Sequence, residues 1–187
     1  MKIHIENLCK SYGGSPVLKN VSFTAGPGVT CIMAPSGSGK TTLLRILLGL
    51  ERPDSGTVGL PEKCRWSAAF QEDRLLEGLD AMGNLRFVLG SALDEAAALA
   101  LLAELGLEDA VGKPAREFSG GMKRRLALAR ALLAPFDVLA LDEPFTGLDQ
   151  DNRERAWRCV REHAAGKPVL LVSHELPPEG AYDLVRL

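Results

Sequence analysis

The chain of 187 residues is 46% hydrophobic and 25% charged, and its formal net charge is −2. That length allows one compact α/β core with a small inserted subdomain, but not two ordinary domains joined by a linker. The slightly acidic balance argues against a polybasic nucleic-acid binder, and no apolar run approaches the ~18 residues of a membrane-spanning helix. The cysteines lack metal-site or disulfide-framework spacing, which predicts a cytoplasmic setting and reduced, core-filling thiols at Cys9, Cys31, Cys64 and Cys159.

Short strand patterns open the chain. Lys2 to Asn7 alternates polar and apolar residues, and Val17 to Thr24 follows a turn at Gly13-Gly14, so these segments predict N-terminal antiparallel strands. The apolar run Val29 to Met33 then predicts a buried strand, and Thr42 to Leu48 predicts an amphipathic helix.

A glycine-rich loop lies between that buried strand and that helix. It fits the pattern G-x-x-x-x-G-K-[ST] except at its first position, where Ala34 adds only a methyl group. Backbone N–H groups at such a helix start converge on phosphates, so the loop predicts binding of a nucleoside triphosphate. Lys40 is predicted to reach the β- and γ-phosphates and the Thr41 hydroxyl to ligate Mg²⁺. The predicted nucleotide-binding residues of the loop are Ser36, Gly37, Ser38, Gly39, Lys40, Thr41 and Thr42.

The middle of the chain is helical. Two further short strands are predicted at Thr57 to Leu60 and Arg65 to Phe70. Apolar residues at helical spacing then predict three helices without an intervening strand, at Asp80 to Gly90, Asp94 to Leu105 and Gly121 to Leu133. This stretch is predicted to form an inserted helical subdomain over residues 72–135.

The sheet resumes after the insertion. Val138 to Leu141 and Val169 to Val172 are continuous apolar runs, typical of parallel strands covered on both faces, and the charged helix Gln150 to Ala165 separates them. The predicted fold is therefore α/β: a P-loop core of mainly parallel strands over residues 1–71 and 136–187, with N-terminal antiparallel strands and the helical insertion, in a single domain.

Two acids follow the strand that ends at Leu141. Asp142 and Glu143 therefore leave the carboxyl end of a parallel strand, the edge on which the phosphate loop opens. Asp142 is predicted to hold Mg²⁺ through water, and Glu143 to act as the general base that polarises the attacking water. The alternative is an acidic helix cap before Pro144.

The order of these motifs resembles that of the ATP-binding subunits of ABC transporters over nearly the whole chain. Phe118 to Met122 resembles the signature loop of that family, in which Ser119, Gly120 and Gly121 contact the γ-phosphate bound by a partner subunit. The resemblance thus implies two chains that sandwich two ATP molecules head to tail. Phe118 and Met122 depart from the commonest Leu and Gln, and the Met variant is similar to the nitrate, sulfonate and taurine importer branch.

Three further motifs carry the resemblance. Gln71 resembles the family's Gln loop, where the amide reaches the metal and the water, although a Gln after a strand is usually a solvated loop residue. His174 resembles the switch histidine that bonds the γ-phosphate and orients Glu143, although a lone His is most often structural. Thr146 to Asp149 resembles the D-loop, in which Asp149 links the two sites, and Tyr12 resembles the aromatic residue that stacks on adenine.

The resemblance implies an ATPase that powers transport with ATP and Mg²⁺. Its implied partners are a second copy or a paired ATPase subunit, integral membrane subunits, and an extracytoplasmic binding protein in the complex, with the chain peripheral on the inner face of the cell membrane. The alternatives are a soluble relative that acts on nucleic acid or ribosomes, and a nucleotide-binding scaffold without turnover. The Lys123-Arg124-Arg125 run is interpreted as a solvated helix face, so no nucleic acid is expected.

Overall fold

The computed structural model describes residues 1–35, 37–61 and 63–187, so the predicted phosphate contact Ser36 lies outside the described residues. The chain divides into two compact units. The first unit comprises Met1–Trp66, Phe136–Glu143 and Gly166–Leu187, and the second comprises Ser67–Pro135 and Pro144–Ala165. The single-domain assignment, with its core at 1–71 and 136–187, stays a prediction.

The first unit begins with the predicted antiparallel sheet. Its strands β1 (Ile3–Tyr12), β2 (Ser15–Ala25) and β4 (Ser55–Gly59) pair in the order β2-β1-β4. Gly13 and Gly14 connect β1 to β2 with φ of 55° and 81°, the left-handed conformation that a tight two-residue hairpin turn requires. The glycine pair therefore produces the turn that the sequence predicts.

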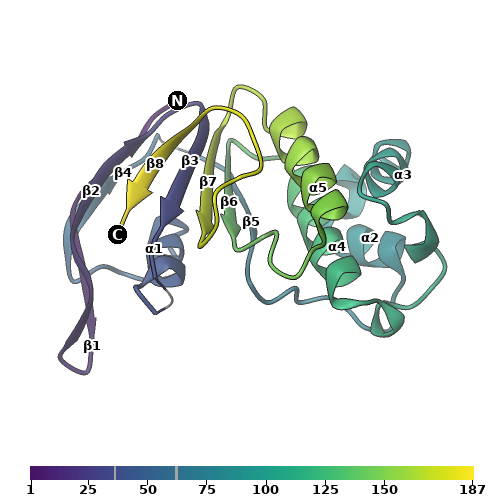
Figure 1. Ribbon diagram of the computed structural model, residues 1–187, viewed down its shortest axis with the longest axis horizontal. Helices are drawn as coiled ribbons and strands as arrows, with labels where there is room; N and C mark the ends of the chain where they lie inside the picture. The colour runs from purple at the N-terminus through teal and green to yellow at the C-terminus, as the bar shows by residue number, and fades with distance from the viewer. Residues whose placement is uncertain (36, 62) are drawn as a thin grey trace. The chain divides into compact units, whose positions relative to one another are not determined.

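The first unit also contains a parallel arrangement of four strands. The strands β3 (Gly28–Met33), β6 (Val138–Asp142), β7 (Pro168–Ser173) and β8 (Tyr182–Arg186) adjoin in the order β6-β7-β3-β8. All three pairings are parallel, and Figure 1 shows β3, β7 and β6 running side by side in one direction. Every residue of β6 and β7 is buried, which explains their continuous apolar sequences. The predicted α/β fold with a mainly parallel sheet is confirmed.

Strand β8 is not among the strands predicted from the sequence. This strand is short and largely exposed, and it follows Pro177-Pro178, so it lacks the apolar run that marks a buried strand. It pairs with β3 from Val29↔Tyr182 to Met33↔Arg186, on the side of β3 away from β7. The strand that enters the phosphate loop is thus held by neighbours on both edges.

The second unit carries most of the helices. It contains β5, which spans Trp66–Ala69 and whose first residue belongs to the first unit, followed by α2 (Ala81–Leu89), α3 (Glu95–Glu104), α4 (Gly120–Leu133) and α5 (Gln150–His163). Each helix has a side-chain cap at its start, from Asp80, Asp94, Ser119 and Asp149 respectively. Short 3₁₀ turns at Gly90–Ala92, Glu108–Ala110 and Ala115–Glu117 lie between these helices.

The predicted element boundaries agree with the structure to within a few residues. The phosphate-loop helix α1 is Lys40–Leu47, so it begins before the predicted Thr42. The strand predicted at Thr57 is β4, which begins at Ser55, and the strand predicted from Arg65 to Phe70 is β5. Apolar periodicity does not locate the exact ends of helices and strands, so shifts of this size are expected.

The interpretation of Lys123-Arg124-Arg125 as a solvated helix face is wrong. Arg125 is only 7% exposed, and its guanidinium donates hydrogen bonds to the backbone oxygens of Leu105 and Gly106. Lys123 and Arg124 are half-buried. A guanidinium can enter a protein interior when carbonyl oxygens satisfy its donors, and helical spacing alone does not show where those oxygens lie.

The prediction of core-filling cysteines holds for only half of them. Cys31 and Cys159 are buried, and burial raises the pKa of their thiols to about 11 and about 12 respectively. Cys9 and Cys64 are half-buried.

Among the described residues, no helix combines the length and the apolar character that crossing a membrane would need.

The core of the second unit generates a stability prediction. Trp157 is 2% exposed and meets the ring of Phe145 edge to face at 6.0 Å. Trp157→Ala should lower the free energy of unfolding by about 3–5 kcal/mol, because it removes a large buried side chain and leaves a cavity. Urea denaturation followed by circular dichroism measures the change. Phe87→Ala is the matched control, since Phe87 is 70% exposed, and equal losses in both variants would contradict the packing described here.

Candidate functional site

The loop between β3 and α1 has a conformation that depends on its glycines. Gly39 caps α1 with φ 88°, and a Cβ atom at this position would lie 2.6 Å from Cγ1 of Val17 and 2.8 Å from Cδ2 of Leu18. Gly37 has φ 80°. Only glycine fits position 39 without strain, because both the dihedral angle and the approach of β2 exclude a side chain.

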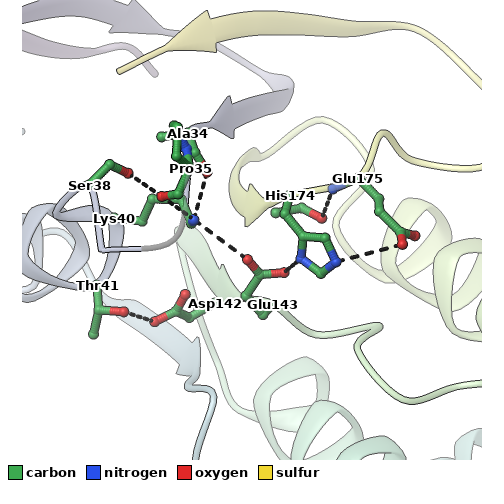
Figure 2. A network of polar contacts seen from close by, with 10 residues as sticks. Ala34, Pro35, Ser38, Lys40, Thr41, Asp142, Glu143, His174 and Glu175 are labelled. Atoms are coloured by element: carbon green, nitrogen blue, oxygen red, sulfur yellow. Dashed lines mark hydrogen bonds and ion pairs between the residues drawn. The ribbon is translucent and has the colours of Figure 1, made fainter.

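Lys40 is the first residue of α1, and its ammonium group is turned back into the loop. Nζ donates hydrogen bonds to the backbone oxygens of Ala34 at 2.7 Å and Pro35 at 3.1 Å, and it lies 3.8 Å from Oε1 of Glu143 (Figure 2). The Ser38 hydroxyl donates to the same Pro35 oxygen at 2.6 Å. Lys40 is 9% exposed, so its ammonium charge is held in a largely desolvated position beside the Glu143 carboxylate.

The next residue of α1 joins the loop to strand β6. The Thr41 hydroxyl donates a hydrogen bond to Oδ2 of Asp142 at 2.7 Å, although the residues are 101 positions apart in the chain. Asp142 is the last residue of β6 and is 1% exposed. A hydroxyl and a buried carboxylate side by side are oxygen ligands of the kind that Mg²⁺ accepts. The carboxylate therefore faces the loop and does not act as the helix cap that the alternative interpretation required.

Glu143 lies at the centre of the site. Its backbone has φ 52°, an unusual conformation for a glutamate, and its N–H group donates to the Val172 oxygen of β7 at 2.9 Å. From this position the two carboxylate oxygens face different partners: Oε1 faces Lys40, and Oε2 lies 2.8 Å from Nδ1 of His174. The Glu143 side chain is 12% exposed, so the carboxylate connects a buried cation to the histidine.

His174 follows β7 directly and forms the outer end of this chain of contacts. Its side chain is 54% exposed, and Nε2 lies 3.6 Å from Oε1 of Glu175. The two ring nitrogens thus face one carboxylate each (Figure 2). A ring bonded to Glu143 through Nδ1 can orient that carboxylate.

Tyr12 stands at the end of β1 with its ring 46% exposed. Its hydroxyl donates to Oε1 of Glu51, and Nζ of Lys10 lies 5.3 Å from the ring centroid. Lys10 in turn lies 3.3 Å from both Glu51 and Asp54. Glu51, the partner of the Tyr12 hydroxyl, lies 39 positions away in the chain, so no local motif predicts this contact.

The second unit brings together the signature-like segment and the segment that resembles the D-loop. A Cβ atom on Gly121 would lie 3.4 Å from Cδ2 of Leu148 and 3.8 Å from the Gly147 oxygen. The Ser119 hydroxyl accepts from the Met122 N–H, and the Asp149 carboxylate accepts from the Asn152 N–H, a bond that lowers the pKa of Asp149. Both side chains therefore cap helices in this structure.

The remaining predicted site residues lie in the loops and helices just described. Gly120 is the first residue of α4 and Thr42 the third residue of α1, where Thr42 is half-buried. Gln71 is exposed and follows β5 in the second unit. The contacts within the first unit thus join Lys40, Thr41, Asp142, Glu143 and His174, and the second unit holds Gln71, Ser119, Gly120, Gly121 and Asp149.

This fold and site define a P-loop protein: a glycine-rich loop joins a central parallel strand to a helix that begins with Lys40-Thr41, and Asp142 and Glu143 stand at the end of β6, a parallel strand separated from β3 by β7. A family model described as ABC transporter matches residues 18–146, well over half of the chain. The chain belongs to the ABC transporter family, and the resemblance inferred from its motifs is confirmed.

Curated relatives agree with this assignment. The chain is 41% identical over 182 residues to an aliphatic sulfonates import ATP-binding protein of Agrobacterium fabrum. This match covers 91% of this chain and 64% of the relative. It is 39% identical over 189 residues to a Nod factor export ATP-binding protein of Paraburkholderia xenovorans, with 92% and 62% covered. It is 35% identical over 181 residues to a zinc import ATP-binding protein of Pseudomonas fluorescens, with 93% and 68% covered. The chain therefore spans about two thirds of the length of these relatives.

Solved structures share the fold. A bacterial ABC transporter cassette described as dimeric superposes with a TM-score of 0.83 at 26% identity, covering 98% of this chain and 94% of that chain. A structure described as the ATP binding subunit of an ABC transporter superposes with a TM-score of 0.81 at 25% identity, covering 94% of this chain and 80% of that chain.

The geometry of Gly39 generates a prediction. Gly39→Ala should lower the free energy of unfolding by about 1–3 kcal/mol, because it forces a side chain into a left-handed conformation and against β2. Chemical denaturation measures the loss. Gly26→Ala is the control, since its φ lies outside the left-handed region and, its chain neighbours apart, no heavy atom lies within 4 Å of the added Cβ. A Gly39 variant as stable as the Gly26 variant would show that the loop tolerates a side chain at this position.

Proposed function

We propose that this chain binds ATP with Mg²⁺ and hydrolyses it to power an ABC transporter. One observation carries the proposal. Side chains from three segments far apart in the sequence meet at the carboxyl ends of parallel strands, where Lys40, Glu143 and His174 form a continuous chain of polar contacts. A cation, a carboxylate and an imidazole in this order can bind a phosphate, accept a proton from water and orient the carboxylate.

Lys40 supplies the phosphate contact in this proposal. Its ammonium is held by loop carbonyl oxygens and a carboxylate, and a γ-phosphate oxygen would take the place of these acceptors. The N–H groups of Gly37 to Thr42 would bind the remaining phosphate oxygens at the start of α1. Ser36 is assigned to the same loop on its sequence position alone.

Thr41 and Asp142 would hold Mg²⁺. Their oxygens lie 2.7 Å apart and fit the preference of this ion for hydroxyl, carboxylate and water ligands. When bound, the ion would neutralise charge on the β- and γ-phosphates. Gln71 is proposed to reach the same ion and the attacking water with its amide.

Glu143 would act as the general base. Its carboxylate accepts the proton of the attacking water, and His174 holds the carboxylate at Oε2 and contributes to orienting the γ-phosphate. The burial of Glu143 supports this role, since its carboxylate is 12% exposed and faces the loop and His174 instead of bulk solvent. Both residues argue against a scaffold without turnover.

The second unit would complete a site on a paired subunit. Ser119, Gly120 and Gly121 present a hydroxyl and glycine backbone at the start of α4, where the helix dipole favours a phosphate. We propose that two chains bind two ATP molecules head to tail, as a second copy of this chain or with a related subunit, and that Asp149 connects the two sites. The Tyr12 ring would stack on the adenine, and the hydrogen bond from its hydroxyl to Glu51 would hold the ring in place.

We further propose that the chain is a single ATPase domain that lies on the inner face of the cell membrane. Its partners there would be integral membrane subunits, with an extracytoplasmic binding protein if the transporter is an importer. Relatives of 35–41% identity include importers of sulfonates and zinc and an exporter of Nod factor, so identity at this level leaves the cargo and the direction of transport open. Action on nucleic acid gains no support from Arg124 and Arg125, whose guanidiniums bind the chain's own carbonyl oxygens.

Lys40→Ala tests the binding half of the proposal. ATP affinity should fall about 10- to 150-fold, because a charge-assisted contact worth roughly 1.5–3 kcal/mol is removed. Calorimetry with Mg-ATP measures the change, and Lys2→Ala, an exposed lysine on the same unit, is the control. A folded Lys40 variant that binds ATP as tightly as the parent would remove the phosphate loop from the proposal.

Glu143→Gln and His174→Ala test the catalytic half. Each should retain ATP affinity while the rate of hydrolysis falls about 100-fold or more, because the amide cannot accept the water's proton and the histidine no longer orients the carboxylate. Single-turnover rates, with nucleotide binding measured separately, report the split. Glu6→Gln, an exposed glutamate on β1, is the control. Hydrolysis within a few-fold of the parent would withdraw that residue from the mechanism.

The same Glu143→Gln variant tests the paired site. With hydrolysis blocked, Mg-ATP should convert a mainly monomeric chain into a dimer, which light scattering detects as a doubling of mass. Adding Ser119→Ala together with Gly121→Ala should abolish that dimer while leaving ATP bound to the loop at Lys40. A stable monomer at saturating Mg-ATP over a broad concentration range would count against head-to-tail pairing of the isolated chains.

A further inference from the structure

The loop of residues 70–76, here called the Gln71 loop, is held by arginine side chains of helix α4. It follows β5 and precedes α2 within the second unit, and Gln71 itself is exposed. The backbone oxygens of Phe70, Asp73 and Arg74 accept hydrogen bonds from the guanidinium groups of Arg124 and Arg130 on α4. These hydrogen bonds account for the partial burial of Arg124 and Arg130.

Arg130 contacts the loop with both arms of its guanidinium. Nη1 donates to the Arg74 oxygen at 2.9 Å, and Nη2 donates to the Asp73 oxygen at 2.8 Å. A planar guanidinium can bridge two successive carbonyl oxygens in this way, whereas a lysine ammonium is a single point donor group. Burial lowers the pKa of Arg130, and the charge of Asp73 opposes that effect.

Arg124 contacts the other side of Gln71. Its Nη1 donates to the Phe70 oxygen at 3.2 Å and lies 3.4 Å from Oδ1 of Asp73. The side chains of Arg124 and Asp73 are only 14% and 21% exposed. The loop is therefore bonded to α4 at residues 70, 73 and 74, which bracket Gln71 on both sides.

The last residue of the loop, Leu76, is held by α2. The buried Asn84 of α2 accepts from the Leu76 N–H at 2.8 Å and donates to the Leu76 oxygen at 3.1 Å. Farther along, the N–H of Ala115 donates to the Leu79 oxygen at 2.8 Å, just ahead of the segment that leads into α4. The Gln71 loop and the segment from 115 to 130 thus share one hydrogen-bonded network within the second unit.

We propose that Arg124 and Arg130 are positioning residues that hold the Gln71 loop on α4, the helix that begins at Ser119 and Gly120. The loop and the segment Ser119 to Gly121 at the start of α4 would then move as one body. A displacement of Gln71 would be transmitted to that segment through the side chains of Arg124 and Arg130. The effect on turnover rests on the proposed function, but the mechanical attachment of the loop does not.

Hydrogen exchange tests the attachment directly. In Arg130→Met, exchange of backbone amides in residues 71–76 should rise about tenfold or more, because two charge-assisted hydrogen bonds are lost. Arg130→Lys should restore part of the protection, since a lysine can bond one of the two carbonyl oxygens. Arg124→Gln should raise exchange in the same segment. Arg116→Met is the matched control, because the Arg116 side chain is 61% exposed.

A kinetic measurement tests the consequence for turnover. Arg130→Lys and Arg124→Gln should lower kcat several-fold with an unchanged dissociation constant for Mg-ATP, because the phosphate loop at Lys40 belongs to the first unit. A purely structural role would raise exchange throughout α2, α4 and α5 and would weaken ATP binding together with kcat. If Arg130→Lys and Arg124→Gln both exchanged amides at residues 71–76 at the rate of the parent chain, the proposal would be overturned. Raised exchange together with an unchanged kcat would overturn it as well. Failure of the parent chain to bind ATP would instead overturn the proposed function.

Discussion

The ion pair and hydrogen bond made by Glu143 are the contacts on which the site depends. One carboxylate faces Lys40 at 3.8 Å and His174 at 2.8 Å, and so connects the loop after β3 with the ends of β6 and β7. The connection is possible because these strands are parallel neighbours, which puts their carboxyl ends at one edge. The left-handed backbone of Glu143 directs its side chain between the two partners, and a hydrogen bond to Val172 holds that backbone.

Buried positive charge is handled in the same manner in both units. Lys40 donates to two carbonyl oxygens of its own loop, and Arg125 donates to the oxygens of Leu105 and Gly106. In each case carbonyl oxygens that accept hydrogen bonds from the charged group offset the cost of desolvating the cation. The difference lies in what surrounds the group: Lys40 also faces the carboxylate of Glu143, whereas Arg125 joins two segments of one helical unit.

Much of the fold was predictable from local pattern. Continuous apolar runs identified β6 and β7, and the Gly13-Gly14 pair identified the first hairpin, because burial and positive φ each leave a direct trace in residue type. Strand β8 was not predictable in this way, because its residues are largely exposed and its place in the sheet comes from pairing with β3. The run Lys123-Arg124-Arg125 was misinterpreted because charge in a sequence does not reveal which carbonyl oxygens will surround it.

The sequence by itself determined the phosphate loop, the family, and the identity of the acids and the histidine at the strand ends, because these depend on residue type at fixed short spacing. The tertiary structure decided which of those groups touch. The contact of Thr41 with Asp142 spans 101 residues and that of Glu143 with His174 spans 31, distances at which spacing carries no information and strand order alone brings side chains together. The tertiary structure also decided the contacts that no motif encodes. Examples are the hydrogen bond from Tyr12 to Glu51 and those from Arg124 and Arg130 to the Gln71 loop. The arginine contacts arise because a folded chain satisfies its part-buried polar groups with whichever partners the packing places nearby.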